Sequence, residues 1–150
     1  MKKFLCLTLG TVLGAGYLPF APGTFGSFAA ILTIYFTSAS DHVGVVVIIV
    51  LSILGIIVST YIEKLKGHDA GIIVIDEYVG QWISILFLPQ TILVLILGFI
   101  LFRIFDIVKP YPINKSQSLK AGWGVMADDI LAGIISNVIL QLILFTGIIK

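Results

Sequence analysis

The segment that decides the fold is VGVVVIIVLSILGIIVSTYI, which covers Val43–Ile62 and contains no charged residue. About 20 apolar helical residues are needed to cross a bilayer whose hydrocarbon core is about 30 Å thick. Its many β-branched residues would favour a strand in water, but a segment in lipid must pair its own backbone groups, and a helix does so. We therefore predict a transmembrane helix here, and a second one at Ile130–Ile149, which is equally free of charge.

The composition of the whole chain points to a membrane protein as well. Of the 150 residues, 59% are hydrophobic and 11% are charged, whereas about a quarter are charged in a typical soluble domain. The mean hydropathy of +1.15 excludes a soluble globular enzyme. A net charge of +1 provides no basic field for nucleic acid, and the lone Cys6 excludes an internal disulfide and a cysteine-based zinc site. The length predicts one domain that covers residues 1–150.

Two other uncharged stretches are interrupted. Glycines and prolines break Phe4–Ser40 into a short N-terminal piece and a helix from about Ser27 to Ser40. Tyr78–Phe102 is broken by Pro89, so it is either one kinked span or two short helices folded as a hairpin. A hairpin places the two charge-rich segments, Glu63–Glu77 and Arg103–Asp129, on the same side of the membrane. Because these segments hold seven of the eight acidic residues, we predict the hairpin.

The resulting prediction is an all-α, polytopic membrane bundle with short helices and a broken helical hairpin around Pro89. Its polar segments converge on one side, together with six of the nine basic residues, and the opposite turns contain no Lys or Arg. The positive-inside rule places this polar side in the cytoplasm.

The first polar segment, GAGYLPFAPGTFGS, covers Gly14–Ser27 and leads into a helix. Glycines let a backbone approach a ligand closely, and a helix N-terminus attracts anions. Thr24 or Ser27 could cap this helix and offer a hydroxyl to a phosphate oxygen. Taken on its own, the segment is better explained by an ordinary turn followed by a capped helix.

Two pairs of acidic residues stand next to apolar runs. Asp76-Glu77 opens the run after the first charged segment, and Asp128-Asp129 comes directly before the final span. Helix-dipole compensation or capping would explain either pair, but ionisable groups at the membrane boundary are costly and usually functional. Adjacent carboxylates repel one another, and Mg²⁺ relieves such repulsion. We therefore predict a metal site at Asp76, Glu77, Asp128 and Asp129.

Arg103 and Asp106 lie three residues apart, and Lys109 follows after three more, so all three share one helix face. An intrahelical ion pair is the simple interpretation. A stripe of this kind at the end of an apolar helix also suits phosphate binding, because Arg offers a bidentate fork and Lys a point charge.

These motifs, together with His68-Asp69, Phe102–Ile113 and Gly122–Gly133, resemble those of the phosphatidylglycerophosphatase A family and occur in its order. The resemblance extends from about Gly10 to Gly147. It implies a multihelical, Mg²⁺-dependent lipid phosphatase of the bacterial inner membrane that converts phosphatidylglycerophosphate to phosphatidylglycerol.

For such a reaction we expect Arg103 and Lys109 to bind the phosphate, helped by Thr24 and Ser27. Asp69 or Asp106 is expected to position or deprotonate the attacking water. Direct attack by water is the first choice, with a covalent carboxyl-phosphate as the alternative. The expected partners are the phospholipid and the membrane, without nucleic acid or a protein partner.

A small ion- or proton-coupled transporter is the alternative from another functional class. It requires polar residues along a path through the spans, and Asn137 and Gln141 are among the few polar residues there. Four residues apart on a helix, these two could instead join neighbouring helices.

Overall fold

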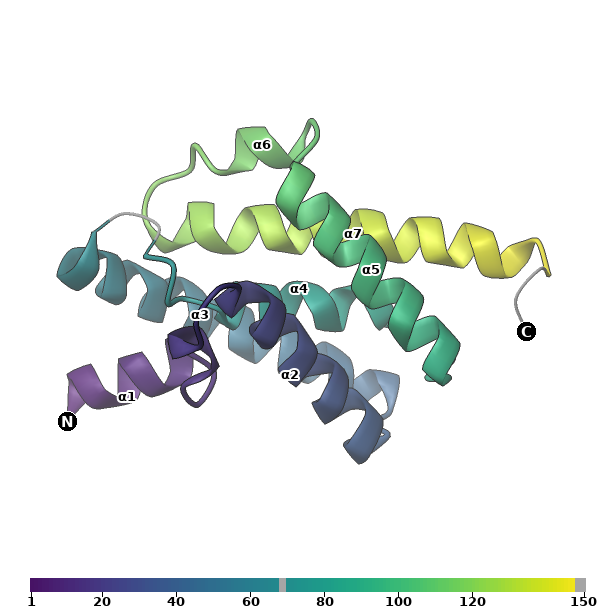
Figure 1. Ribbon diagram of the computed structural model, residues 1–150, viewed down its shortest axis with the longest axis horizontal. Helices are drawn as coiled ribbons and strands as arrows, with labels where there is room; N and C mark the ends of the chain where they lie inside the picture. The colour runs from purple at the N-terminus through teal and green to yellow at the C-terminus, as the bar shows by residue number, and fades with distance from the viewer. Residues whose placement is uncertain (68–69, 148–150) are drawn as a thin grey trace.

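Regular structure is entirely helical in the computed structural model, which describes residues 1–67 and 70–147 (Figure 1). This confirms the all-α prediction for the described residues. The elements are α1 (Lys2–Gly10), the 3₁₀ turn η1 (Ala15–Tyr17), α2 (Pro22–Thr37), α3 (Asp41–Lys66), α4 (Ile75–Ile85), α5 (Ile92–Val108), α6 (Ile113–Ser116) and α7 (Gly122–Phe145).

Among the described residues, α3 and α7 are the helices long and apolar enough to cross a membrane. Most of their apolar residues are not buried inside the protein: Val46, Ile53 and Ile57 of α3 are each more than half exposed. A soluble protein would bury such helices, because exposed apolar surface in water is costly. Lipid is the environment that suits them, and this agrees with a membrane protein.

The helix α7 begins earlier than the sequence predicted. The final span was expected at Ile130–Ile149, with Asp128 and Asp129 before it, but the helix starts at Gly122 and includes both aspartates. Both are buried, and Asp128 is paired with Lys109, so their charges are accommodated inside the helix. Helix α3 contains the whole of the predicted span Val43–Ile62.

The helix α2 also begins earlier, at Pro22 instead of about Ser27. Proline suits the first helical turn because its φ is already helical and it lacks an N–H that would stay unpaired there. The prediction that Thr24 or Ser27 caps this helix is therefore wrong. Ala21 is the N-cap residue, and both hydroxyl residues lie inside the helix.

The predicted break around Pro89 is confirmed, because α4 and α5 are separate helices joined by residues 86–91. At 11 residues, α4 is too short to span a bilayer. Its last carbonyl groups are bound by α7: the Asn137 amide donates to the carbonyl oxygens of Leu86 (2.9 Å), Ile83 (3.1 Å) and Ser84 (3.2 Å). Gln141 Nε2 in turn donates to Asn137 Oδ1 at 2.7 Å. Asn137 thus joins α7 to the end of α4, as proposed from the sequence, whereas the bond of Gln141 lies within α7 and holds the Asn137 amide.

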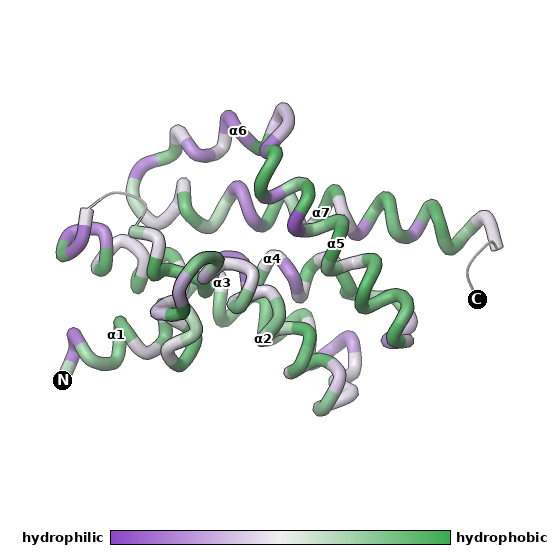
Figure 2. The backbone as a smooth tube through the Cα atoms, viewed as in Figure 1, coloured by the Kyte–Doolittle hydropathy of each residue, from purple (hydrophilic) through white to green (hydrophobic). Residues whose placement is uncertain are grey.

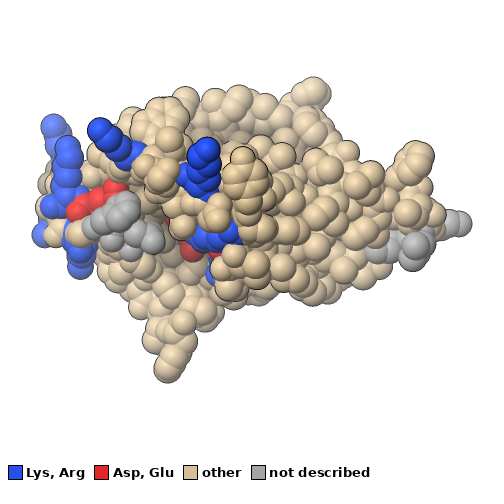
Figure 3. Space-filling view, turned by 90° about the horizontal axis from the view of Figure 1, so that it is seen from above, with Lys and Arg blue, Asp and Glu red and all other residues tan. Residues whose placement is uncertain are grey.

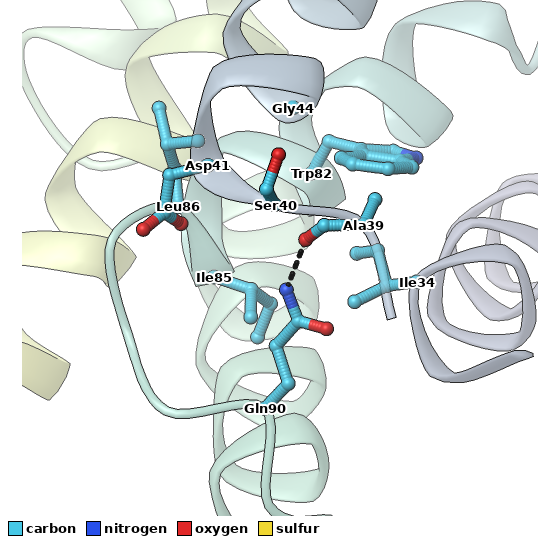
Figure 4. A pocket seen from close by; sticks show the side chains of 9 residues that line it. All are labelled: Ile34, Ala39, Ser40, Asp41, Gly44, Trp82, Ile85, Leu86 and Gln90. Carbon is cyan, nitrogen blue, oxygen red and sulfur yellow. Dashed lines mark hydrogen bonds between the residues drawn. The ribbon is translucent and has the colours of Figure 1, made fainter. Parts of the chain in front are cut away.

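The turn of the hairpin lies beside the turn between α2 and α3. Gln90 Nε2 donates to the Ala39 carbonyl oxygen at 2.8 Å, and Asp41 Oδ1 accepts from the Phe87 amide at 3.1 Å. Figure 4 shows the first of these bonds at the edge of a cavity of about 10 Å³. Both turns therefore lie at one end of the molecule, which leaves the polar segments at the other.

Helix α4 lies near the middle of the molecule and contacts α2, α3, α5 and α7 (Figure 1). Hydrophobic residues dominate α3, α5 and α7, whereas α6 and the C-terminal end of α3 are largely hydrophilic (Figure 2). The first turn of α4, which carries Asp76 and Glu77, therefore begins at the centre of the helical frame rather than at its surface.

Candidate active site

Three carboxyl groups from two helices form the centre of the site. Asp76 and Glu77 stand in the first turn of α4, where acidic residues complement the helix dipole. Asp129 stands in the second turn of α7. One carboxylate oxygen of each of the three lies within 4.8 Å of those of the other two. This spacing is suitable for a shared cation.

Each of these three carboxyl groups has one buried oxygen without a hydrogen-bond partner. The atoms are Asp76 Oδ1, Glu77 Oε2 and Asp129 Oδ2. A buried polar atom without a partner costs free energy, and native proteins rarely leave several side by side. A metal ion bound to all three would remove this cost, so the donor set fits a hard, oxygen-binding cation such as Mg²⁺.

The pKa values of the two carboxyl groups on α4 also fit a site that binds a cation. Burial, together with the negative charge of Asp128, raises the pKa of Asp76 to about 6. Burial also raises the pKa of the Glu77 carboxyl well above its ordinary value, and the neighbouring Asp76 adds to this. Without a cation, these carboxyl groups therefore resist being ionised together.

A chain of alternating charges runs alongside the three carboxyl groups. Arg103 Nη1 lies 4.0 Å from Glu77 Oε1 and donates to Asp106 Oδ2 at 2.6 Å. The other oxygen of Asp106 lies 3.7 Å from Lys109 Nζ, which donates to Asp128 Oδ2 at 2.5 Å. Residues from α4, α5 and α7 are therefore linked by ion pairs into one site.

The two cations in this row of ion pairs, Lys109 and Arg103, both keep their positive charge next to the carboxyl groups. Burial alone would lower the pKa of Lys109, but the carboxylates of Asp128, Asp129 and Asp106 raise it above its usual value, so the ammonium group stays charged. The buried Nε of Arg103 has no hydrogen-bond partner. This N–H is a free donor next to the carboxyl groups, and guanidinium groups bind phosphate oxygens well.

Helix α2 closes the site through the glycine-rich segment. A Cβ atom at Gly23 would collide with Glu77 Oε1 and lie 3.2 Å from Arg103 Nη1, so only glycine allows this approach. One turn later, Ser27 Oγ lies 3.5 Å from Arg103 Nη1. Thr24, which is next to Gly23, belongs to the same helical turn. The segment thus brings the start of α2 against the charged groups.

Two glycines that the sequence analysis left without a role bring α4 and α7 together. A Cβ at Gly80 would lie 2.6 Å from the carbonyl oxygen of Asp129, and a Cβ at Gly133 would collide with the carbonyl oxygen of Gly80. This close crossing is what places Asp129 near Asp76. The signal in the sequence was a glycine inside each of two apolar helices, a typical mark of close helix packing in membranes.

The structure brings most of the predicted site residues together, in two groups. Asp76, Glu77 and Asp129 form the carboxyl group cluster, whereas Asp128, also predicted as a metal ligand, faces Lys109. The adjoining row of ion pairs contains Arg103, Asp106 and Lys109, and Ser27 contacts it through Arg103. The predicted catalytic Asp69 and its neighbour His68 lie outside the described residues.

Similarity to known proteins extends over nearly the whole chain. The profile of the family described as phosphatidylglycerophosphatase A matches residues 8–144. A Bacteroides thetaiotaomicron protein named "Putative phosphatidylinositol-3-phosphatase" is 38% identical, over 93% of this chain and 95% of its own length.

Two relatives carry the family name itself. Phosphatidylglycerophosphatase A of Escherichia coli K12 is 38% identical over 90% of this chain and 81% of its own length. The Haemophilus influenzae protein of the same name is 36% identical over 87% and 83%. No solved structure matches the chain. The profile match over nearly the whole chain and the identity of these relatives show that the chain belongs to the phosphatidylglycerophosphatase A family.

Proposed function

We propose that this chain is a Mg²⁺-dependent membrane phosphatase that hydrolyses phosphatidylglycerophosphate to phosphatidylglycerol and phosphate. The observation that carries the proposal is the cluster of Asp76, Glu77 and Asp129, each with an unpartnered buried oxygen, beside the free Nε of Arg103. The E. coli and H. influenzae relatives are named for this activity.

Asp76, Glu77 and Asp129 would hold the metal. When bound, Mg²⁺ supplies charge neutralisation for the phosphate and a water molecule of lowered pKa. Asp128 is a positioning residue in this proposal, since its carboxylate is engaged by Lys109.

Arg103 and Lys109 would bind the phosphate of the substrate. A phosphomonoester carries about two negative charges near neutral pH, and two fixed cations match them. The Ser27 hydroxyl donates to the Gly23 carbonyl oxygen and accepts from Arg103 Nη1, so in this proposal it orients the guanidinium group. Thr24, in the first turn of α2, would donate to a phosphate oxygen.

In the reaction, the oxygen of a water molecule forms a bond to phosphorus, and the bond from phosphorus to the glycerol oxygen breaks. The attacking water gives up one proton, and the glycerol oxygen takes up one and becomes a hydroxyl of phosphatidylglycerol. Asp106 has one oxygen on Arg103 and the other near Lys109, so we assign it to orienting the two cations. Of the two residues expected to position the water, Asp69 is then the one that we propose for this role.

The geometry does not favour a transporter. In the described part of the chain, the charged side chains of the site collect at the start of α4 and the end of α5 rather than along a path through the bundle. Deeper in the bundle, the polar residue Asn137 connects two helices, because its amide donates to carbonyl oxygens at the end of α4.

We further propose a multi-pass topology in the bacterial inner membrane with the site facing the cytoplasm. In a Cys6→Ser background, cysteines introduced at Lys66 and Lys115 should resist impermeant thiol reagents in intact cells and react after lysis. Labelling of either position from outside would contradict this orientation.

The function is tested by phosphate release from phosphatidylglycerophosphate by the purified protein, with and without Mg²⁺. Phosphatidylinositol 3-phosphate is the comparison substrate, because of the name of the Bacteroides relative. We expect release that requires Mg²⁺ and prefers phosphatidylglycerophosphate. A preference for the inositol lipid would refute the substrate assignment, and turnover in a metal chelator would refute the metal.

A further inference from the structure

Among the described residues, six exposed lysines lie outside the proposed site. We call them the lysine collar; they are Lys2, Lys3, Lys64, Lys66, Lys115 and Lys120. They stand at the start of α1, at the end of α3, on α6 and in the turn before α7. All four places are ends or connections of helices rather than spans.

The collar surrounds one end of the molecule. The Gly122 amide donates to Thr60 Oγ1 at 3.1 Å, and Lys64 and Ala121 line one groove of about 240 Å³, so the end of α3 lies beside the start of α7. Figure 3 shows Lys and Arg side chains over this half of the visible face and, among the described residues, none over the half that carries the end of α7.

Exposed negative charge is scarce at this end. Among residues 1–67 and 70–147, Asp41 is the one exposed acidic residue, and it lies at the opposite end, where it accepts a hydrogen bond from the Phe87 amide. Outside the site, the acidic residue of the described part at the collar end is Glu63, which is half-buried and lines the same groove as Lys64. The described surface at the polar end therefore carries more positive than negative charge, although the net charge of the chain is only +1.

The site itself has the opposite charge. It contains five carboxyl groups, Asp76, Glu77, Asp106, Asp128 and Asp129, and the two cations among them are already paired with carboxylates. A Mg²⁺ ion bound as proposed would offset most of the excess negative charge but would not reverse it, so the site itself does not attract an anionic lipid from a distance. An outer ring of cations supplies that attraction for a molecule approaching along the membrane surface.

We infer that the lysine collar is a docking surface for anionic phospholipid headgroups of the surrounding leaflet, which it concentrates next to the site. The inference rests on the proposed function for its purpose, but the docking itself is independent of turnover. Lysines at headgroup level attract anionic lipids, and each adds to the attraction.

Lipid association can be measured without turnover by tryptophan fluorescence. Trp123 is 60% exposed and lies three residues after Lys120, whereas Trp82 is only 6% exposed. In phosphatidylcholine vesicles, brominated phosphatidylserine should quench the wild-type protein at least about fivefold more effectively than brominated phosphatidylcholine. This preference should be lost in one variant, called the glutamine variant, that combines Lys64→Gln, Lys66→Gln, Lys115→Gln and Lys120→Gln. The same four positions changed to Arg form the matched control and should keep it.

The kinetic consequence is a rise in KM for phosphatidylglycerophosphate of about tenfold in the glutamine variant, with kcat unchanged, since these lysines lie outside the site. Added salt should raise KM of the wild type and leave that of the variant nearly constant. Equal quenching by the two lipids in the wild type, or an unchanged preference in the glutamine variant, would overturn the docking surface. If the preference depends on the collar but the lipid is not hydrolysed, the docking surface stands and the proposed function fails.

Discussion

Replacing Asp129 with Asn should separate metal binding from folding. The change keeps the shape of the side chain but removes one of the three carboxylates that lie within 4.8 Å of one another. At a Mg²⁺ concentration 100 times Kd, binding stabilises the folded state by about 2.7 kcal/mol. For a chain of this size, each kcal/mol moves Tm by about 2–4 °C, so Mg²⁺ should raise wild-type Tm by about 5–11 °C.

In Asp129→Asn we expect most of this Mg²⁺-dependent rise to disappear, and turnover to fall by about 10²–10³-fold. Without Mg²⁺ the variant should be at least as stable as the wild type, because a buried carboxyl group beside Asp76 and Glu77 is a repulsive one. The measurement is thermal unfolding in detergent over a series of Mg²⁺ concentrations.

Two other aspartates provide controls for this experiment. Asp41→Asn makes the same chemical change at the far end, and the amide oxygen can still accept from Phe87, so the full rise in Tm should remain. Asp128→Asn should also keep most of the rise and lose turnover, since Asp128 pairs with Lys109. A Tm rise in Asp129→Asn equal to that of the wild type would refute the assignment of the metal to this cluster.

Three further substitutions test the remaining parts of the site and its frame. Arg103→Lys keeps the charge but loses the fork and the free Nε, so kcat/KM should fall by at least about tenfold with little change in Tm, and full activity would remove Arg103 from the site. Gly23→Ala places a methyl group where a Glu77 oxygen lies and should reduce turnover more than stability, whereas Gly71→Ala, which has open space, should be silent in both assays. Asn137→Leu removes the three hydrogen bonds that its amide donates and the one that it accepts from Gln141, and should cost about 2–4 kcal/mol in denaturant unfolding; Gln141→Leu removes only that last bond and should cost about 1 kcal/mol, so equal costs would contradict the role of Asn137.

Helix type and number were largely predictable, and helix starts were not. Lipid requires helices, so the charge-free runs and the break at Pro89 led to the correct elements. The starts of α2 and α7 were missed because both helices extend past the apolar run into polar sequence. There, Gly23 lies against Glu77, and Asp128 is satisfied by Lys109, contacts that come from segments far along the chain.

Candidate residues for the site could be named from the sequence, but their arrangement could not. Residue types and spacing pointed to carboxylates for a metal and to Arg103 and Lys109 for phosphate. The separation of Asp129 from Asp128 follows from their different directions on a helix, but which of them faces Asp76 depends on the crossing of α4 and α7 at Gly80 and Gly133. That crossing is a tertiary property.

The close approach of these helices has an energetic consequence. Glycines at Gly23, Gly80 and Gly133 let three backbones come near enough to crowd charged groups into one buried region. The carboxyl groups gathered there oppose folding while their charges are uncompensated, and the apolar packing around them must supply the difference. Under the proposed function, binding of a cation would stabilise the same region that it activates. The empty protein should consequently open first at the start of α4, and Mg²⁺ should protect the amides of residues 75–79 from hydrogen exchange more than those at the far end of α3.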